Sequence, residues 1–278
     1  VVVAGEGGHV LWSDDAVTFH PVTLPDAADA TDMVWMPELA LFLAVGGNEM
    51  VGKAWTSPDG VSWSSQTLAG FTGRATGVAW GGGQAMICGP GGRVMASTNG
   101  IQWTARNSGT SENLTAIEWG GGRFAATGSG GIVIHSADGV AWTRYQLGLD
   151  HVTYNGLVFG NGLWIVPDGF ELRLTMDFGN WWSAQGQAYK PNPLFAFGEF
   201  IASNQRYILG SSDGVYWQNY IDGLGPETSY PPATGYVRGV RFGNRVVFVG
   251  LGGLVGVSGV WRDFFQEWRV ARFTAAEL

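Results

Sequence analysis

The chain has 278 residues, of which 45% are hydrophobic and only 14% are charged, and its net charge is −8 at neutral pH. This composition provides for a large apolar core and excludes a disordered chain. Lys53 and Lys190 are the only lysines and no run of basic residues occurs, so a nucleic-acid partner is excluded as well.

The sequence also argues against membrane insertion, disulfides and metal sites. No stretch of about 18 consecutive apolar residues occurs. Cys88 is the single cysteine, which excludes an intrachain disulfide and a cysteine-based metal site. The four histidines do not have the spacing of zinc ligands; they are His9, His20, His135 and His151. We therefore expect no metal and no cofactor.

The chain begins part-way through a repeat. Residues 1–19 (VVVAGEGGHVLWSDDAVTF) align with residues 123–142 (RFAATGSGGIVIHSADGVAW). The aligned segment starts at the second strand of a repeat, and nothing before it in the sequence supplies a first strand. We therefore expect Val1 to lie in a second strand.

Six hairpin motifs follow one another at nearly even spacing. Each combines a small hydroxyl residue, an Asp or Asn, a Gly or another turn residue, and an aromatic. They are SDDAVTF (13–19), SPDGVSW (57–63), STNGIQW (97–103), SADGVAW (136–142), TMDFGNW (175–181) and SSDGVYW (211–217). The steps between the aromatics are 44, 40, 39, 39 and 36 residues. This period is typical of four-stranded propeller blades.

The best-preserved repeat covers residues 114–146. It predicts four short strands, LTAIEW, RFAATG, IVIHS and VAWTRYQ, separated by GGG, GSGG and ADG turns. Two more series of markers share the period. Aromatics end the first strand of each repeat, namely Trp35, Trp80, Trp119, Phe159, Phe197 and Phe242, and GxGG turns begin at Gly5, Gly89, Gly128 and Gly250.

The C-terminal residues 268–278 (WRVARFTAAEL) are expected to follow the fourth strand of the last repeat, and they place Phe273 where the aromatic of a first strand is expected. We therefore predict an all-β fold: a seven-bladed β-propeller of four-stranded antiparallel blades, closed by pairing the C-terminal strand with the N-terminal blade. Residues 1–278 form a single propeller domain in this prediction. A six-bladed ring with an odd terminal piece is the alternative, because the last repeat (VSGVWRDFF) lacks the hairpin motif.

The hairpin motif resembles the Asp-box of sialidases and other propellers. Three copies set Asp and Gly adjacent, whereas the usual form separates them by one residue, as TMDFGNW does. The resemblance implies a structural role, in which the carboxylate accepts backbone N–H groups across the turn and the aromatic packs between strands. The residues with this implied role are Asp15, Phe19, Asp59, Trp63, Asn99, Trp103, Asp138, Trp142, Asp177, Trp181, Asp213 and Trp217.

The repeats also resemble those of bacterial surface proteins and of phage tail or fibre proteins, since they combine GNG or GGG turns with DGVxW hairpins. This resemblance implies a virion or an extracellular or cell-surface location. It also implies other subunits of a virion or surface assembly as partners.

The candidate binding residues lie where the repeats depart from their own pattern, since such departures mark functional or strained positions. A propeller brings the turns between second and third strands to the same face as the links between blades. Three departures fall on this face in successive blades: PDGFELR with Asp168, Glu171 and Arg173, SNQRY with Asn204 and Arg206, and IDGLGPETSYPPATGY with Glu227, Tyr230 and Tyr236. A long loop that is merely tolerated at the surface is the plain alternative.

These residues suit a glycan or a protein surface, because Arg, carboxylate, amide and Tyr side chains recognise both. We therefore expect a non-enzymatic binding or structural propeller with no catalytic residues, for example a receptor-binding component of a viral tail or fibre. The alternative is a sialidase-like glycoside hydrolase, which needs an arginine cluster, an acid and a Tyr nucleophile. The arginines are scattered over different repeats. An intracellular scaffold is a third possibility that no motif favours.

Overall fold

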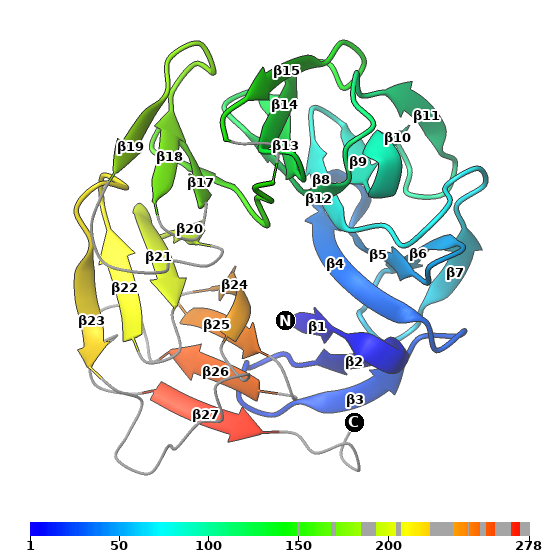
Figure 1. Ribbon diagram of the computed structural model, residues 1–278. Helices are drawn as coiled ribbons and strands as arrows, with labels where there is room; N and C mark the ends of the chain where they lie inside the picture. The colour runs from blue at the N-terminus through cyan, green and yellow to red at the C-terminus, as the bar shows by residue number, and fades with distance from the viewer. Residues whose placement is uncertain are drawn as a thin grey trace. The chain divides into compact units, whose positions relative to one another are not determined.

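The computed structural model describes residues 1–148, 151–167, 171–184, 193–203, 207–222, 236–243, 245–250, 254–258 and 268–272. Within these ranges the chain forms 27 β-strands, three short 3₁₀ turns and no α-helix. The strands make seven antiparallel sheets, and strands that follow one another in the chain lie side by side in each sheet (Figure 1). The prediction of an all-β fold is confirmed.

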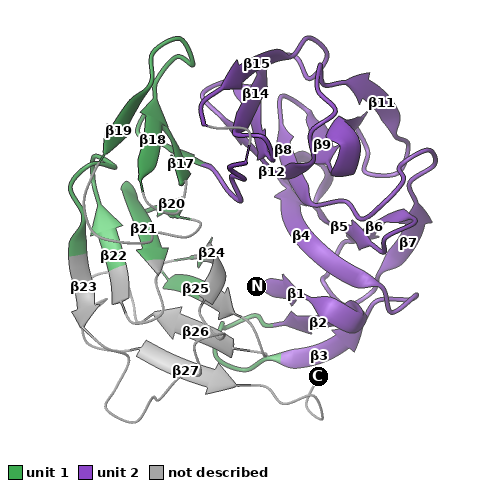
Figure 2. Ribbon diagram, in the orientation of Figure 1, with its two compact units in different colours: residues 1, 13–19, 158–278 green, residues 2–12, 20–157 purple. Residues whose placement is uncertain are grey.

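The described residues divide into two compact units (Figure 2). Unit 1 consists of residues 1, 13–19 and 158–278, and unit 2 of residues 2–12 and 20–157. The single domain over residues 1–278 stays a prediction.

Unit 2 contains one three-stranded sheet and three four-stranded sheets. The three-stranded sheet is β1 (Val2–Ala4), β2 (His9–Trp12) and β3 (His20–Thr23). The four-stranded sheets are β4 (Asp29–Met36), β5 (Leu41–Gly47), β6 (Gly52–Ser57) and β7 (Ser64–Thr67); β8 (Gly77–Gly81), β9 (Gln84–Cys88), β10 (Arg93–Ser97) and β11 (Thr104–Asn107); and β12 (Leu114–Gly120), β13 (Arg123–Gly128), β14 (Ile132–Ser136) and β15 (Thr143–Gln146). The 3₁₀ turns are η1 (Glu6–Gly8), η2 (Pro37–Leu39) and η3 (Pro90–Gly92).

The other described strands form three four-stranded sheets in unit 1. They are β16 (Val158–Gly160), β17 (Leu163–Pro167), β18 (Leu172–Thr175) and β19 (Trp182–Ala184); β20 (Leu194–Ala196), β21 (Glu199–Ser203), β22 (Tyr207–Ser211) and β23 (Gln218–Asp222); and β24 (Tyr236–Phe242), β25 (Arg245–Gly250), β26 (Leu254–Ser258) and β27 (Trp268–Arg272).

Tight glycine turns join the first and second strands of two sheets in unit 2. Gly121 and Gly122 have φ angles of 55° and 75°, and Gly82 and Gly83 have φ angles of 57° and 75°. A two-residue hairpin turn with positive φ at both positions suits glycine, because other side chains are strained there. The GGG sequences therefore fix where these strands end and how they pair.

Phe197 does not end a first strand, contrary to the expectation from the sequence. In β20 it is Phe195 that pairs with Phe200, just as Trp119 pairs with Phe124 in unit 2. Phe197 lies in the turn itself, with a φ of 56°. The FG dipeptide marks the turn in this repeat, so the aromatic of the strand lies two residues earlier.

A similar shift occurs in the last sheet. Phe242 pairs with Arg245 and directly precedes the turn, so Arg241 occupies the position that Trp119 has in its own sheet. The guanidinium carbon of Arg241 lies 4.6 Å from the centre of the Phe197 ring. A cation–π contact therefore takes the place of an aromatic side chain there.

The two end sheets differ from the predicted pattern. Among the described residues β1 pairs with β2 alone, so the N-terminal sheet has three strands where the others have four. Residues 268–272 are the fourth strand of the last sheet and pair with β26, whereas the sequence had suggested that they follow the fourth strand. Phe273 lies outside the described residues. Closure by the C-terminal strand therefore stays a prediction.

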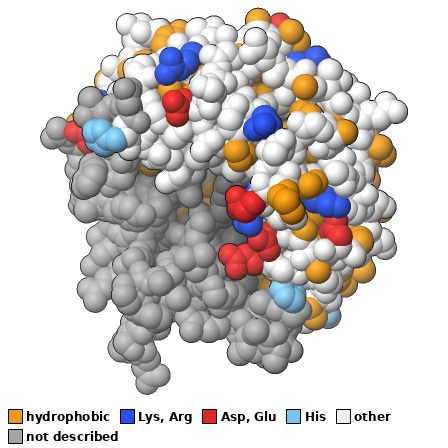
Figure 3. Space-filling model, turned by 45° about the vertical axis from the view of Figure 1, so that its right-hand side comes forward, with side chains coloured by type: hydrophobic (Ala, Val, Ile, Leu, Met, Phe, Trp, Pro, Cys, Tyr) orange, Lys and Arg blue, Asp and Glu red, His pale blue; other side chains and the backbone are white. Residues whose placement is uncertain are grey.

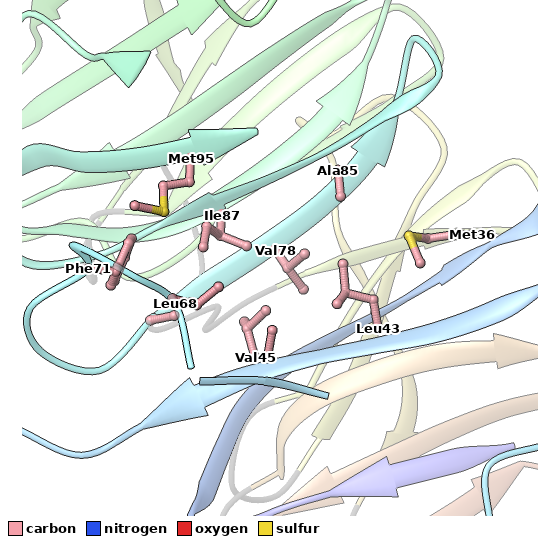
Figure 4. Packing of buried hydrophobic residues seen from close by; sticks show 11 residues of the cluster. Met36, Leu43, Val45, Leu68, Phe71, Val78, Ala85, Ile87 and Met95 are labelled. Atoms are coloured by element: carbon pink, nitrogen blue, oxygen red, sulfur yellow. The ribbon is translucent and has the colours of Figure 1, made fainter. Parts of the chain in front are cut away.

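The core of each unit lies between neighbouring sheets. Met36, Leu43 and Val45 of one sheet in unit 2 meet Val78 and Ile87 of the next (Figure 4), and each is at most 5% exposed. Burying one such side chain contributes about 1.5–3 kcal/mol. Comparable clusters lie between the next pair of sheets, between the N-terminal sheet and its neighbour, and between two sheets of unit 1. Sheets within a unit therefore pack face to face.

Candidate functional site

The hairpins that carry the sequence motif are held by one set of hydrogen bonds. Ser57 Oγ accepts the N–H of Gly60 at 2.8 Å and donates to Asp59 Oδ1 at 3.0 Å. Asp59 Oδ1 also accepts the N–H groups of Val61 and Ser62 at 2.8 and 2.7 Å. The other five hairpins repeat this pattern with Asp15, Asn99, Asp138, Asp177 and Asp213.

These hydrogen bonds lower the pKa of the hairpin carboxyls. The backbone N–H groups of Ser62 and Val61 are the main cause that lowers the pKa of Asp59 to about 2. The pKa of Asp15 is likewise about 2, and those of Asp138, Asp177 and Asp213 are lowered in the same way. A carboxylate held in this form is unsuited to act as a general acid at neutral pH.

The aromatic residues of the motif differ in their polar contacts. The indole N–H groups of Trp63, Trp181 and Trp217 donate to backbone carbonyls at 3.0–3.2 Å. Those of Trp103 and Trp142 have no hydrogen-bond partner among the described residues. Phe19, without a polar atom in its ring, is half-buried. The shared feature of the series is therefore the packed ring.

The opposite ends of the strands in unit 2 form a second surface, which we call the loop face. It consists of the turns between second and third strands and the links from each fourth strand to the next sheet. These segments are bonded to one another: Leu24 N–H donates to Gly8 O at 2.8 Å, and Ser129 N–H donates to Asn113 O at 2.8 Å. The loop face is therefore ordered by its own backbone.

Asp26, in the link after β3, is the centre of one polar cluster on the loop face. Its carboxylate lies 2.9 Å from Lys53 Nζ and accepts hydrogen bonds from Trp55 Nε1 at 2.8 Å and Ser65 Oγ at 2.7 Å. Burial opposes its ionisation, but these three contacts together outweigh burial and lower its pKa. Asp26 is thus an anion whose charge is already balanced.

Asp29, at the start of β4, is the centre of a second cluster. Its Oδ1 accepts the N–H of Gly7 at 2.8 Å, and its Oδ2 lies 2.8 Å from Arg74 Nη2. Asn113, directly before β12, makes a contact equivalent to that between Asp29 and Gly7: its Oδ1 accepts the N–H of Gly91 at 2.8 Å. Both side chains hold a GxGG turn in place from the neighbouring sheet.

Two acidic side chains of the loop face are left without such compensation. Glu6 and Glu49 lie in the turns after β1 and β5, both are exposed, and neither forms an ion pair within the described part of the chain. The face seen in Figure 3 shows acidic side chains grouped with a basic side chain among them. Glu6 and Glu49 thus carry negative charge that no ion pair among the described residues neutralises.

Most of the residues that the sequence singled out for binding lie outside the described ranges: Asp168, Asn204, Arg206, Glu227 and Tyr230. Tyr236 begins β24, and its backbone pairs with Gly250. Glu171 Oε2 lies 3.7 Å from Arg173 Nη2, and Arg173 Nη1 donates to Ser183 Oγ at 2.7 Å. The structure thus brings two of the predicted residues together in unit 1.

No protein-family model and no curated protein matches this sequence. Solved structures do match. YCF48 bound to D1 peptide has a TM-score of 0.67 at 18% identity, over 89% of this chain and 82% of that chain. Virginiamycin B lyase from Staphylococcus aureus has a TM-score of 0.74 at 9% identity, over 88% of this chain and 85% of that chain.

The fold is a β-propeller. A further propeller-like match, the nidogen/laminin complex, has a TM-score of 0.53 at 13% identity and covers 75% of this chain and 87% of that chain. At such identities the likeness shows the fold alone, since one fold supports many functions. Each four-stranded sheet is accordingly a blade.

Among the described residues, no group of three or more His, Cys, Asp or Glu side chains is placed so that it could hold a metal ion. No described helix has the length and apolar character to cross a membrane. Where the carboxyl pKa values in these ranges are shifted, they are lowered.

Sequence reasoning missed the two polar clusters of the loop face. A usable signal existed, since Asp29 and Asn113 each lie 22 residues after the turn glycine that they hold. The cluster around Asp26 gave no such signal. Its contacts join residues separated by 29 and 39 positions, and they do not recur in the described parts of the other repeats.

Proposed function

We propose that this chain is a non-enzymatic binding propeller whose loop face recognises a basic protein surface. The observation that carries the proposal is the pair of exposed acids without an ion-pair partner among the described residues, Glu6 and Glu49, each on a turn held by hydrogen bonds to a side chain, Asp29 in the first case and Asn48 in the second. A rigid turn loses little conformational entropy when a partner binds. Uncompensated charge attracts a partner of opposite sign and discourages others.

Two of the structural matches are consistent with protein binding. YCF48 was solved with a peptide, and nidogen was solved with laminin. The lyase match is a reminder that propellers also support catalysis. A sialidase-like hydrolase is less well supported here, because it requires a carboxylic acid with a raised pKa and a cluster of arginines. The described Arg74 and Arg173 each have an acidic partner of their own.

We also propose that the propeller has seven blades of the Asp-box type. Support comes from seven sheets in the described ranges and from six hairpins in which the hydroxyl donates to an Asp carboxylate or, at Asn99, to a side-chain amide. On the resemblance of the repeats, we place the protein on a virion or cell surface, within a tail, fibre or comparable assembly. A glycan on that surface is the alternative partner.

The test selects ligands for the immobilised chain from a displayed library of random peptides. We expect the enriched peptides to be rich in Lys and Arg and to bind less tightly as the salt concentration rises. The double variant Glu6→Gln, Glu49→Gln should lose about tenfold or more in affinity, as expected for two charges at an interface.

A matched control raises the net charge by the same amount as the double variant, but at the hairpin turns and not on the loop face. The double variant Gln102→Lys, Ala141→Lys changes exposed residues there and should bind as the unmodified chain does. Enrichment of uncharged peptides, or an equal loss of affinity in the control variant, would argue against binding of a basic partner at the loop face. Binding to neutral glycans on an array would show that the partner is a sugar and not a protein. Turnover of a fluorogenic sialoside would show that the propeller is an enzyme.

A further inference from the structure

Three Asn-Gly pairs occur in the chain, at residues 99–100, 155–156 and 161–162. In such a pair the backbone nitrogen of the glycine can attack the side-chain carbonyl carbon of the asparagine, because glycine has no Cβ to hinder the approach. The attack releases the side-chain nitrogen as ammonia and closes a succinimide ring. In a folded chain the rate depends on how the reacting atoms are held, and the three pairs differ in this respect.

The fold holds both reacting groups of the first pair. Asn99 Oδ1 accepts the N–H groups of Ile101 and Gln102, each at 2.9 Å, so the side-chain carbonyl is fixed in the turn. The N–H of Gly100, whose nitrogen would attack, donates to Ser97 Oγ at 2.8 Å in a buried position. Ring closure at Asn99 would have to break these hydrogen bonds, which is costly in a buried turn.

The fold also holds the third pair, through its leaving group. Asn161 lies in the turn between β16 and β17, and its Nδ2 donates to Gly198 O and Ser212 O, both at 3.0 Å. This nitrogen is the one that the reaction releases. The side chain therefore cannot rotate toward the nitrogen of Gly162 without losing both hydrogen bonds.

The pair at residues 155–156 has no such restraint. The Asn155 side chain is exposed. Within the ranges that the structure describes, neither this side chain nor the backbone N–H of Gly156 forms a hydrogen bond. Residues 155–157 also lie outside the described strands, since β16 begins only at Val158. Both reacting groups are therefore free to approach each other.

Asn155 occupies a position that a threonine fills in the preceding blades. It follows Tyr154 as Thr115 follows Leu114, and the N–H groups of Tyr154 and Leu114 donate to equivalent turn glycines of their preceding blades. Thr115 Oγ1 donates to Thr127 O at 3.1 Å and to Tyr154 O. The threonines of the two blades before it bond in the same way. The repeat thus replaces a bonded hydroxyl with an unbonded amide at residue 155.

We propose that Asn155 is a site of spontaneous deamidation in the folded protein, whereas Asn99 and Asn161 are protected by their hydrogen bonds. The nitrogen of Gly156 loses its proton to hydroxide and attacks Cγ of Asn155. The bond from Cγ to the side-chain nitrogen breaks, and ammonia leaves. Water then opens the succinimide at either carbonyl and gives an aspartate or an isoaspartate. One water is consumed for each ammonia released, and no other reactant is needed.

The modification adds a negative charge to the link that follows β15, which belongs to the loop face of unit 2. The isoaspartate form also lengthens the main chain by one atom just after Tyr154, whose N–H and carbonyl are both bonded. The site depends only on the chemistry of the pair and its surroundings, so it does not rest on the proposed function.

The test follows the three pairs by peptide mass spectrometry while the full 278-residue chain is kept in neutral buffer. Fragment ions distinguish Asn155 from Asn161. We expect Asn155 to convert about tenfold faster than the other two, or more, the factor expected for the hydrogen bonds that hold them. In guanidinium chloride, where no fold protects any pair, the difference should largely vanish. The proposal is overturned if Asn155 in the folded chain converts no faster than Asn99.

Two variants test the reasons given for reactivity and protection. Asn155→Thr restores the residue of the preceding blades, and the aged variant should show no new acidic species on anion exchange. Equal acidification of this variant would overturn the proposal. Ser97→Ala frees the N–H of Gly100 and should speed conversion of Asn99 but not of Asn161. Faster conversion of both would show that this variant unfolds, and the comparison within the unmodified chain then decides.

Discussion

The Asp or Asn side chain of each hairpin motif stabilises the turn by accepting hydrogen bonds. Five hairpins use a carboxylate and one uses the amide of Asn99, which accepts the N–H groups of Ile101 and Gln102 at 2.9 Å. The geometry is the same in both cases, but only the carboxylates change charge with pH. The chain thus contains an internal comparison between a titrating and a non-titrating hairpin.

Stability should depend on pH through these carboxylates. The pKa of Asp59 is about 2 in the folded chain, below the value of about 3.9 in an unfolded chain. Its hydrogen bonds therefore add stability above about pH 4, and this contribution is lost as the pH falls through the folded pKa. Asp59→Asn should flatten the dependence of the urea midpoint on pH in this range.

The reverse substitution is the matched control. Asn99→Asp introduces a carboxylate into the same hydrogen-bond pattern and should steepen the loss of stability between about pH 4 and pH 2. Identical pH profiles for the two variants and the unmodified chain would show that the hairpin carboxylates are not linked to folding.

The hydroxyl of the motif should contribute more to the free energy of unfolding than an exposed side chain near a motif does. Ser136 is 2% exposed, and its Oγ accepts the N–H of Gly139 at 2.9 Å and donates to Asp138 at 3.0 Å. Ser136→Ala leaves a buried N–H without a partner and should lower the free energy of unfolding by about 1–3 kcal/mol. Thr104→Ala, at an exposed strand position, should change it by less than about 0.5 kcal/mol in the same urea titration.

At the scale of strands, contact between blades depends on glycines as well as on apolar side chains. Gly81 lies against the Trp119 ring, and in unit 1 Gly160 lies against the Phe195 ring. A Cβ atom added to either glycine would come within 2.0 Å of a ring atom. Gly81→Val should lower the free energy of unfolding by about 3 kcal/mol or more, because neither the backbone nor the indole can move freely. Thermal unfolding measures this loss.

Gly5 provides the control for that substitution. An added Cβ at Gly5 meets no atom within 4 Å, and its φ of −156° is open to any residue. Gly5→Ala should therefore leave the unfolding temperature nearly unchanged. If Gly81→Val were equally harmless, the proposed contact between turn and indole would have no part in stability.

The strands were predictable because turn residues and aromatics recur with the period of the blade. The GGG and GSGG turns placed the first three strands of the repeat at residues 114–146 well, whereas its fourth strand begins at Thr143 and not directly after the ADG turn. Prediction failed where one of these markers changed its position, as at Phe197, whose aromatic ring sits in a turn with positive φ. A pattern of residue types does not reveal such a shift, since pairing depends on the backbone conformation of the turn.

At the scale of the whole molecule, the net charge of −8 and the acidic turns point to a basic partner. The sequence predicted a binding face built from turns and links, but it did not identify Glu6 and Glu49. Their significance depends on which other acids are neutralised, as Asp26 is by Lys53 and Asp29 by Arg74. Such pairing over long sequence separations is visible only in the folded chain.

A crystal structure of the chain with a peptide selected from the random library tests the central claim most directly. Our account predicts that the peptide lies on the loop face of unit 2, with its Lys or Arg side chains within ion-pair distance of Glu6 and Glu49. A peptide bound at the hairpin turns instead, with both glutamates still open to solvent, would contradict it.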